Sequence, residues 1–283
     1  MTPDFRIDAH HHLWDLAKRE QTWTEGLPEL HRTFTMDDLI PHLIDNDIAG
    51  TVLVQTINDP EETPELLLQA HESPYVLGVV GWIDLTNDVA DQIAFLQSQP
   101  GGDALKGVRH LVQGEPDVNW LARPDVRDGL REVGDANLVY DILVYPHQID
   151  VAISTVRALP EVTFVLDHCG KPRINDGVID EWRRQMVELS ASENVAVKLS
   201  GLVTEADRAH WSERDLQPYV DVVLDSFSPR RVMFGSDWPV CQLAATYDEV
   251  VSTAESLTAS LGSDEKNALF GATASQWYGL EAE

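Results

Sequence analysis

The stretch FRIDAHHHLWD, residues 5–15, shows the pattern that decides the fold, because a short apolar run ends directly in polar side chains. Its first part, Phe5 to Ala9, has the length and residue types of a buried β-strand. Seven similar runs follow along the chain, at 51–56, 76–83, 104–111, 138–144, 162–168, 195–199 and 231–235. Each is short, apolar and rich in β-branched residues, so we expect eight strands.

Helix-like stretches lie between most of these runs. Strand alternating with helix predicts a parallel sheet, because a crossover between parallel strands needs a connection as long as a helix. Eight such units without a Gly/Ser-rich linker favour a closed (β/α)8 barrel over an open, doubly wound sheet. We therefore expect an α/β fold, with a single barrel domain over residues 1–283. Two long loops, at 13–35 and 113–124, would follow the first and fourth strands.

The composition excludes several classes of function. The chain has 48 acidic and 20 basic residues, a net charge of −28, and nucleic acid or an anionic membrane would need the opposite sign. No apolar run approaches the roughly 18 residues of a membrane helix, and residues 1–6 lack the pattern of a signal peptide. Two cysteines fit a reducing compartment, so we expect a cytoplasmic protein. The acidic surface fits either a salt-adapted cytoplasm or a GC-rich genome.

The ends of the expected strands carry the residues that could perform chemistry. His10 and His12 are two apart, so they project from the same face of an extended chain and could bind one metal ion or one substrate. The later strand ends are Lys106-Gly107-Val108-Arg109-His110, Tyr140-Asp141, Asp167-His168-Cys169-Gly170-Lys171, Val197-Lys198 and Gly235-Ser236-Asp237-Trp238. In a barrel these ends meet on one rim, so distant residues become neighbours. A lone His168, Lys198 or Asp237 could be structural, but together they indicate a site.

These motifs resemble those of a known family. Ile7-Asp8-Ala9-His10-His11-His12-Leu13-Trp14-Asp15 is similar to the opening of the amidohydrolase superfamily. The later blocks match, in order, the amidohydrolase-2 group that contains sugar lactonases of the L-fuconolactonase and L-rhamnonolactonase kind. These blocks are 105–110, 167–172, 197–202 and 234–239, with a similar tail at 269–280. The resemblance covers nearly the whole chain and implies a (β/α)8 barrel that hydrolyses its substrate.

The resemblance also implies where a metal would bind. It points to His10, His12, His168 and Asp237 as metal-site or active-site positions. The two-metal members of the superfamily need a bridging carboxylate or modified lysine and a histidine on strand five, where this chain has Asp141. A single Zn²⁺ held by His10, His12 and Asp237, with or without His168, would fit instead. Part of the lactonase group works without an obligatory metal, so whether a metal is bound stays open.

Hydrolysis of a sugar lactone to the aldonic acid, a reaction of carbohydrate metabolism, is the expected activity. Asp237 is the expected general base, a role that contributes about 10²–10⁴-fold. Lys198, Arg109 and His168 are the expected clamp on the oxyanion, where one donor is worth roughly 2.7–4 kcal/mol. We prefer Arg109 to Lys106, which would face the other side of the strand, because Arg109 lies nearer its C-terminal end. The expected substrate-binding residues are Trp14, Trp23, His110, Asp141, His147 and Trp238.

Three other functions remain open. A metal-dependent decarboxylase of an aromatic or unsaturated carboxylic acid would use Arg109 to bind the carboxylate. A pyrone-dicarboxylate lactonase would need several site arginines, and Arg109 and Arg173 are the candidates. A catalytically inactive sugar-binding barrel is the third. The expected partner is a small sugar lactone, without nucleic acid or membrane, and the chain is either a monomer or a homo-oligomer.

Overall fold

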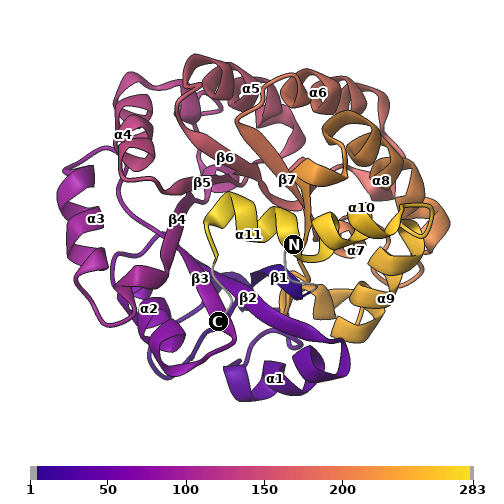
Figure 1. The fold of residues 1–283 in the computed structure, drawn as a ribbon, viewed down its shortest axis with the longest axis horizontal. Helices are drawn as coiled ribbons and strands as arrows, with labels where there is room; N and C mark the ends of the chain where they lie inside the picture. The colour runs from indigo at the N-terminus through magenta and orange to yellow at the C-terminus, as the bar shows by residue number, and fades with distance from the viewer. Residues whose placement is uncertain (1–4, 281–283) are drawn as a thin grey trace.

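The structure is a computed structural model that describes residues 5–280; residues 1–4, which we inspected for a signal peptide, and 281–283 lie outside the described residues. Eight parallel strands form one sheet in sequential order (Figure 1). They are β1 (Arg6–His11), β2 (Ile48–Val54), β3 (Val76–Gly81), β4 (Leu105–His110), β5 (Val139–Ile142), β6 (Thr163–Leu166), β7 (Val195–Leu199) and β8 (Val232–Phe234). A parallel bridge between His11 and Trp238 joins the first strand to the chain beyond the last. The expected (β/α)8 barrel is confirmed.

Helices form a ring around this barrel, as Figure 1 shows. The ring contains α1 (Met36–Asp45), α2 (Glu62–Glu72), α3 (Val89–Gln97), α4 (Pro124–Asp135), α5 (Ile149–Ala158), α6 (Asp180–Ser190), α8 (Glu213–Phe227) and α9 (Tyr247–Leu257). Three shorter α-helices are α7 (Leu202–Glu205), α10 (Ser263–Asn267) and α11 (Thr273–Tyr278). Within residues 5–280, no helix combines the length and the apolar character that crossing a membrane requires.

Every second side chain of a strand points into the barrel, so successive inward-facing residues form layers. Two such layers fill the interior. The apolar layer consists of Ile7, Ala9, Val52, Val54, Val80, Val139, Val165, Ala196 and Met233, with Ala274, Tyr278 and Leu280 packed against them from the end of the chain. Figure 1 shows α11 lying across this end of the barrel. Two residues beyond Val139, Val165 and Ala196 come Asp141, Asp167 and Lys198, and together with Arg109 of β4 we call them the charged layer. Each member of the charged layer is at most 3% exposed.

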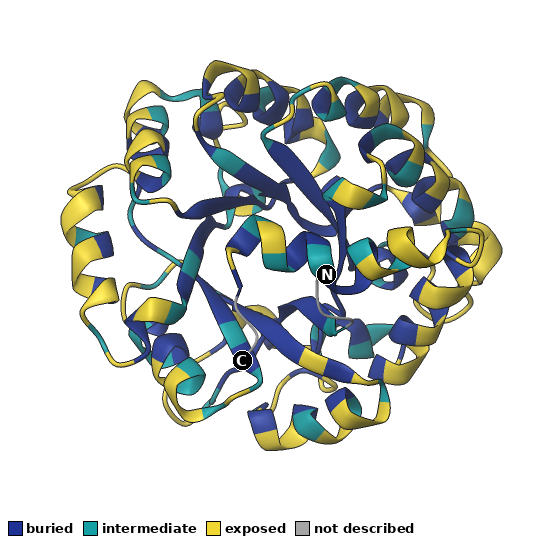
Figure 2. Cartoon of the chain, viewed as in Figure 1, coloured by how far each residue is buried: buried dark blue, intermediate teal, exposed yellow. Residues whose placement is uncertain are grey.

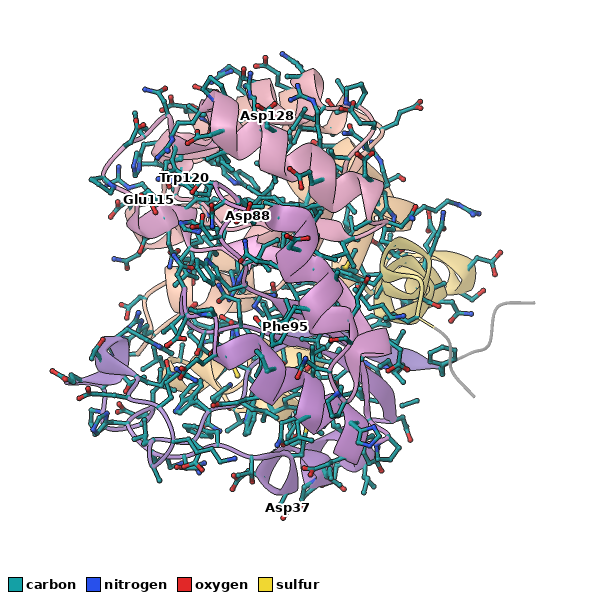
Figure 3. The ribbon with its side chains drawn as sticks, turned by 90° about the vertical axis from the view of Figure 1, so that its left-hand side faces the viewer. Asp37, Asp88, Phe95, Glu115, Trp120 and Asp128 are labelled. Atoms are coloured by element: carbon teal, nitrogen blue, oxygen red, sulfur yellow. The ribbon has the colours of Figure 1, made fainter. Side chains whose placement is uncertain are left out.

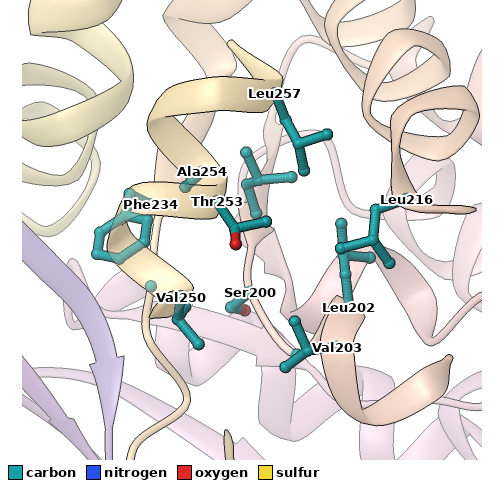
Figure 4. Close-up of a pocket in the computed structure, with 12 residues that line it drawn as sticks. Ser200, Leu202, Val203, Leu216, Phe234, Val250, Thr253, Ala254 and Leu257 are labelled. Atoms are coloured by element: carbon teal, nitrogen blue, oxygen red, sulfur yellow. The ribbon is translucent and has the colours of Figure 1, made fainter. Parts of the chain in front are cut away.

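Between the strands and the helices lies a second, larger apolar core. Figure 2 shows the helices buried on the side that faces the barrel and exposed on the outside. A small cavity of about 30 Å³ remains in this core between β7, β8, α8 and α9. Its lining is mainly aliphatic, with Thr253 and Ser200 as polar exceptions (Figure 4).

Two segments extend the face of the barrel opposite α11. One runs from β1 to α1 and the other from β4 to α4. Figure 3 shows Glu115 and Trp120, from the segment after β4, on the side of the molecule away from the yellow C-terminal helices. Trp120 stacks on His110, with ring centroids 4.0 Å apart and planes 14° apart. The carboxyl ends of the strands therefore open toward this face.

Candidate active site

The end of β1 brings two histidines into the barrel. The pairing of β1 with β2 is irregular between Asp8 and His11, so strict alternation is broken there. His10 and His12 lie together, with their Nε2 atoms 3.2 Å apart. His11 points elsewhere and lies 2.9 Å from the Thr51 hydroxyl.

Two residues in left-handed conformations complete the centre. Strand β6 ends at Leu166, two residues before the expected end, and the chain turns there with φ of 52° at His168. Asp237, after β8, has a φ of 57°. Such values are uncommon outside glycine and collect at functional sites. Gly201 packs against the His168 ring, where a Cβ would lie 2.8 Å from Nδ1, so no larger residue fits.

These elements gather three histidines around one carboxylate. Asp237 Oδ1 lies 3.5 Å from Nε2 of His12, 3.8 Å from Nε2 of His10 and 3.9 Å from Nε2 of His168. One ligand atom from each of His10, His168 and Asp237 lies within 4.8 Å of the others. Four residues predicted from three separate strand ends are thus neighbours.

The outer nitrogens of the three imidazoles have partners of their own. Their Nδ1 atoms lie 3.3 Å from Asp167 Oδ1 for His10, 2.7 Å from the Val54 carbonyl for His12 and 2.8 Å from the Ser200 hydroxyl for His168. This leaves the Nε2 atoms directed at the centre, which is how histidines are held around Zn²⁺. The donor set therefore fits one zinc ion.

The charged layer lies directly beneath the histidines. The Lys198 ammonium is 2.6 Å from Asp141, 3.1 Å from Asp167 and 3.1 Å from His10 Nδ1. Arg109 donates to Asp167 at 2.8 Å. Tyr278, from α11, donates to both oxygens of Asp141 at 2.7 and 2.9 Å. The buried cations are therefore paired with buried carboxylates, as burial requires.

Burial and neighbouring charges set the protonation states of the centre. Burial lowers the pKa of His168 to about 4 and, helped by Lys198, that of His10 well below its usual value. Burial raises the pKa of Asp237, but His168 and His12 outweigh it, so the net pKa is lowered. His10 and His168 are then neutral and Asp237 is ionised at neutral pH. Lys198 and Arg109 balance Asp141 and Asp167, so no cation of the charged layer is paired with Asp237.

Asp8 and Asp167 are two buried carboxylates to which we assigned no role from the sequence. Asp8 accepts hydrogen bonds from the backbone N–H of His10 (3.1 Å), from that of Ser236 (2.8 Å) and from the Ser236 hydroxyl (2.6 Å). It therefore joins β1 to the turn that carries Asp237. The signal for Asp167 was present, because it follows the inward-facing Val165 by two residues.

The six predicted substrate-binding residues are not gathered in one place. Trp14 and Trp238 are 5% and 1% exposed and pack on Phe34 in the apolar core. Trp23 is 38% exposed and lies against Trp14. Of the others, Asp141 belongs to the charged layer, His110 is 8% exposed and paired with Glu115 at 2.7 Å, and His147 is exposed on the rim. Their contact with substrate stays a prediction.

Comparison with known proteins identifies the family. The family described as amidohydrolase matches residues 7–280. The chain belongs to the amidohydrolase family. Among amidohydrolase relatives, it is 37% identical to an L-fucono-1,5-lactonase of Burkholderia multivorans, over 97% of this chain and 96% of the relative. It is 34% identical to an L-fucono-1,5-lactonase of Burkholderia ambifaria, over 98% and 96%.

A solved amidohydrolase has the same fold. The crystal structure of an amidohydrolase from Burkholderia multivorans with bound zinc is similar to this chain, with a TM-score of 0.92 at 36% identity. The match covers 98% of this chain and 100% of the solved one.

Proposed function

We propose that this amidohydrolase hydrolyses the ester bond of a sugar lactone to give the aldonic acid. The observation that carries the proposal is the ionised Asp237 carboxylate, surrounded by three histidines at the carboxyl ends of the strands. The relatives named L-fucono-1,5-lactonase support the substrate class. An ionised base beside a neutral imidazole that can donate a hydrogen bond is the arrangement that addition of water to a lactone carbonyl needs.

In the proposed reaction Asp237 moves the proton. It takes a proton from water as the water oxygen bonds to the carbonyl carbon, and the carbonyl oxygen becomes an oxyanion. Collapse of this intermediate breaks the ring C–O bond, and the proton on Asp237 passes to the departing alkoxide. The acid is released with Asp237 ionised again, so no further reactant is consumed.

The remaining residues stabilise charge. His168 is the clamp candidate whose Nε2 faces the centre, at 3.9 Å from Asp237, so without a metal we assign it the oxyanion. In this role its Nδ1 accepts from the Ser200 hydroxyl and its Nε2 carries the proton. Lys198 and Arg109 have no free surface, and they act through His10 and Asp167, which they contact. If zinc binds, His10, His168 and Asp237, with His12 beside them, would hold it, and the ion would supply Lewis acidity.

The state of the arginines favours the lactonase over the alternatives. A decarboxylase would need a guanidinium free to bind the substrate carboxylate, but Arg109 is 3% exposed and donates to Asp167 and to Gln55 Oε1. A pyrone-dicarboxylate lactonase would need several arginines, and Arg173 is paired with Asp176 at 2.8 Å. A binding protein without activity would not need the strained, ionised Asp237.

A hydrolysis assay with a pH indicator tests the proposal. Aldonolactones of the L-fucono, L-rhamnono, L-galactono, D-arabinono and D-xylono series would be offered to the protein as purified, after chelation, and with Zn²⁺ restored. We expect turnover of at least one lactone. Loss on chelation and recovery with Zn²⁺ would make the histidine cluster a required metal site, whereas survival would assign the reaction to the residues alone. No hydrolysis of any lactone in any state would contradict the proposal.

A further inference from the structure

A groove on the catalytic face lies beside the centre and has no part in the reaction described above. It is formed by the segments that follow β5, β6 and β7, with one side of α6, and has a volume of about 550 Å³. Sites for small molecules span about 300–1,000 Å³, so a sugar-sized molecule would fit. We call it the Lys171 groove, and the residues that matter here are Tyr145, His147, Lys171, Arg173, Glu181 and Glu205.

The Lys171 groove is connected to the catalytic histidine through the chain, because Lys171 follows His168 by three residues. The backbone N–H of Lys171 donates to the His168 carbonyl at 2.8 Å. The Lys171 charge reaches both His168 and Asp237, since it lowers the pKa of each. Gly201, packed on the His168 ring, begins the short segment that ends in Glu205. Two walls of the groove therefore come from segments that contact His168.

The wall of the groove carries a donor and an acceptor side by side. The Lys171 ammonium lies 2.9 Å from Glu205 Oε1, and the two side chains are 16% and 22% exposed. One hydroxyl group can accept from the ammonium while its neighbour donates to the carboxylate, and such charge-assisted hydrogen bonds are the strong ones. The pair therefore matches two adjacent hydroxyl groups of a sugar.

The rest of the groove suits a neutral molecule with an apolar face. Tyr145 is 41% exposed, and its ring is stacked with His147 and lies 6.0 Å from the Lys171 ammonium. An exposed aromatic ring offers a surface for the C–H face of a sugar. The Lys171 and Arg173 cations are already paired, with Glu205 and Asp176, so the groove does not select a carboxylated ligand.

We propose that the Lys171 groove binds the hydroxylated part of the lactone, and that Glu205 and Lys171 determine which sugar lactone is used. The inference rests on the proposed lactonase function. It adds a separate site of specificity, because a site built to hydrogen-bond a hydroxyl rejects analogues that lack it.

Steady-state kinetics with L-fucono-1,5-lactone test the groove. Glu205→Gln keeps the shape of the side chain but removes its charge, and Tyr145→Ala removes the aromatic surface. For both variants we expect KM to rise about tenfold with kcat within threefold of wild type. Arg157→Met is the matched control, because Arg157 pairs with Glu188 on the outer helices at 2.7 Å, and its KM should not change.

The outcomes distinguish a failure of the groove proposal from a failure of the proposed lactonase function. If KM of both groove variants stays within threefold of wild type, or if kcat falls at unchanged KM, the groove does not bind the substrate. If the wild type hydrolyses none of the aldonolactones, the proposed function itself fails. Melting curves show that each variant is folded, and Glu205→Asp should recover part of the lost affinity if the carboxylate is the acceptor.

Discussion

The two layers inside the barrel lie only two residues apart on the same strands, yet they are held together differently. In the apolar layer, Val165 and Ala196 are fully buried among aliphatic neighbours, and each contributes through its own contacts. In the charged layer, Asp167 and Lys198 are equally buried, and each is stable because its charge is paired, with the other and with a further member of the layer. The comparison teaches that burial alone does not set the effect of a mutation, since a missing charge leaves its partner unpaired.

The strongest way to break the charged layer is Lys198→Met. Removing the ammonium leaves Asp141 and Asp167 buried without their shared cation. Breaking a buried pair on one side costs about 3–5 kcal/mol, so we expect the free energy of unfolding in urea to fall by that amount.

A double variant checks the cause of that loss. Lys198→Met combined with Asp141→Asn removes one of the two stranded carboxylates, so its stability should lie between that of the single variant and wild type. A loss below 1 kcal/mol in the single variant would show that the layer is not held by its charge pairs.

The free energy of unfolding should depend on pH through Glu62, a buried residue that supports the charged layer. Glu62 is 3% exposed and accepts hydrogen bonds from the backbone N–H groups of Thr56 and Ile57. These two residues follow Gln55, which accepts a hydrogen bond from Arg109 of the charged layer. Burial raises the pKa of Glu62 to about 7, from an ordinary 4.5. The folded state thus keeps its proton longer than the unfolded state, so this contribution is complete below pH 4.5 and is lost as the pH rises through 7.

Glu62→Gln should remove this dependence. From the two pKa values, wild type loses up to about 3 kcal/mol more than the variant between pH 4.5 and 8. Urea unfolding of both proteins at pH 5 and pH 8 measures the difference. Parallel pH dependences for the two proteins would mean that Glu62 is ionised in the fold.

Asp237→Asn sharpens the comparison, because Asp237 carries the charge that no cation in the centre balances. We expect kcat to fall at least a hundredfold, or about 2.7 kcal/mol of barrier, through loss of the general base. Stability should stay near that of wild type, since no buried partner is stranded. Near-normal turnover of the lactone that wild type hydrolyses would remove Asp237 as the base.

The smallest effect is expected in the apolar layer. Val165→Ala deletes two methyl groups from a fully buried side chain, which costs about 1–2 kcal/mol. The kcat should remain within twofold of wild type, although Asp167 lies two residues away. An activity loss comparable to that of Asp237→Asn would mean that the two layers are mechanically coupled.

The sequence predicted what depends on strand periodicity and on barrel geometry. The eight strands and the meeting of His10, His168 and Asp237 follow from strand ends that converge on one rim. The burial of Trp14 and Trp238 could not be predicted, because it depends on the path of irregular segments, in which apolar residues follow no regular spacing.

Residues that act through others were also harder to predict. Asp167 could have been predicted to face the barrel interior, because it lies two residues after the inward-facing Val165. Tyr278 could not, because no local pattern says which end of the barrel the last helix covers.

The hydrogen bonds from Tyr278 to Asp141 have a consequence for how the protein is made. The two residues are 137 positions apart, and ribosomes add about 5–20 residues per second, so Asp141 emerges on the order of 10 s before its partner. During that interval the growing chain carries acidic and basic groups that the finished barrel buries. The interior therefore cannot be fully assembled until the final helix has been synthesised.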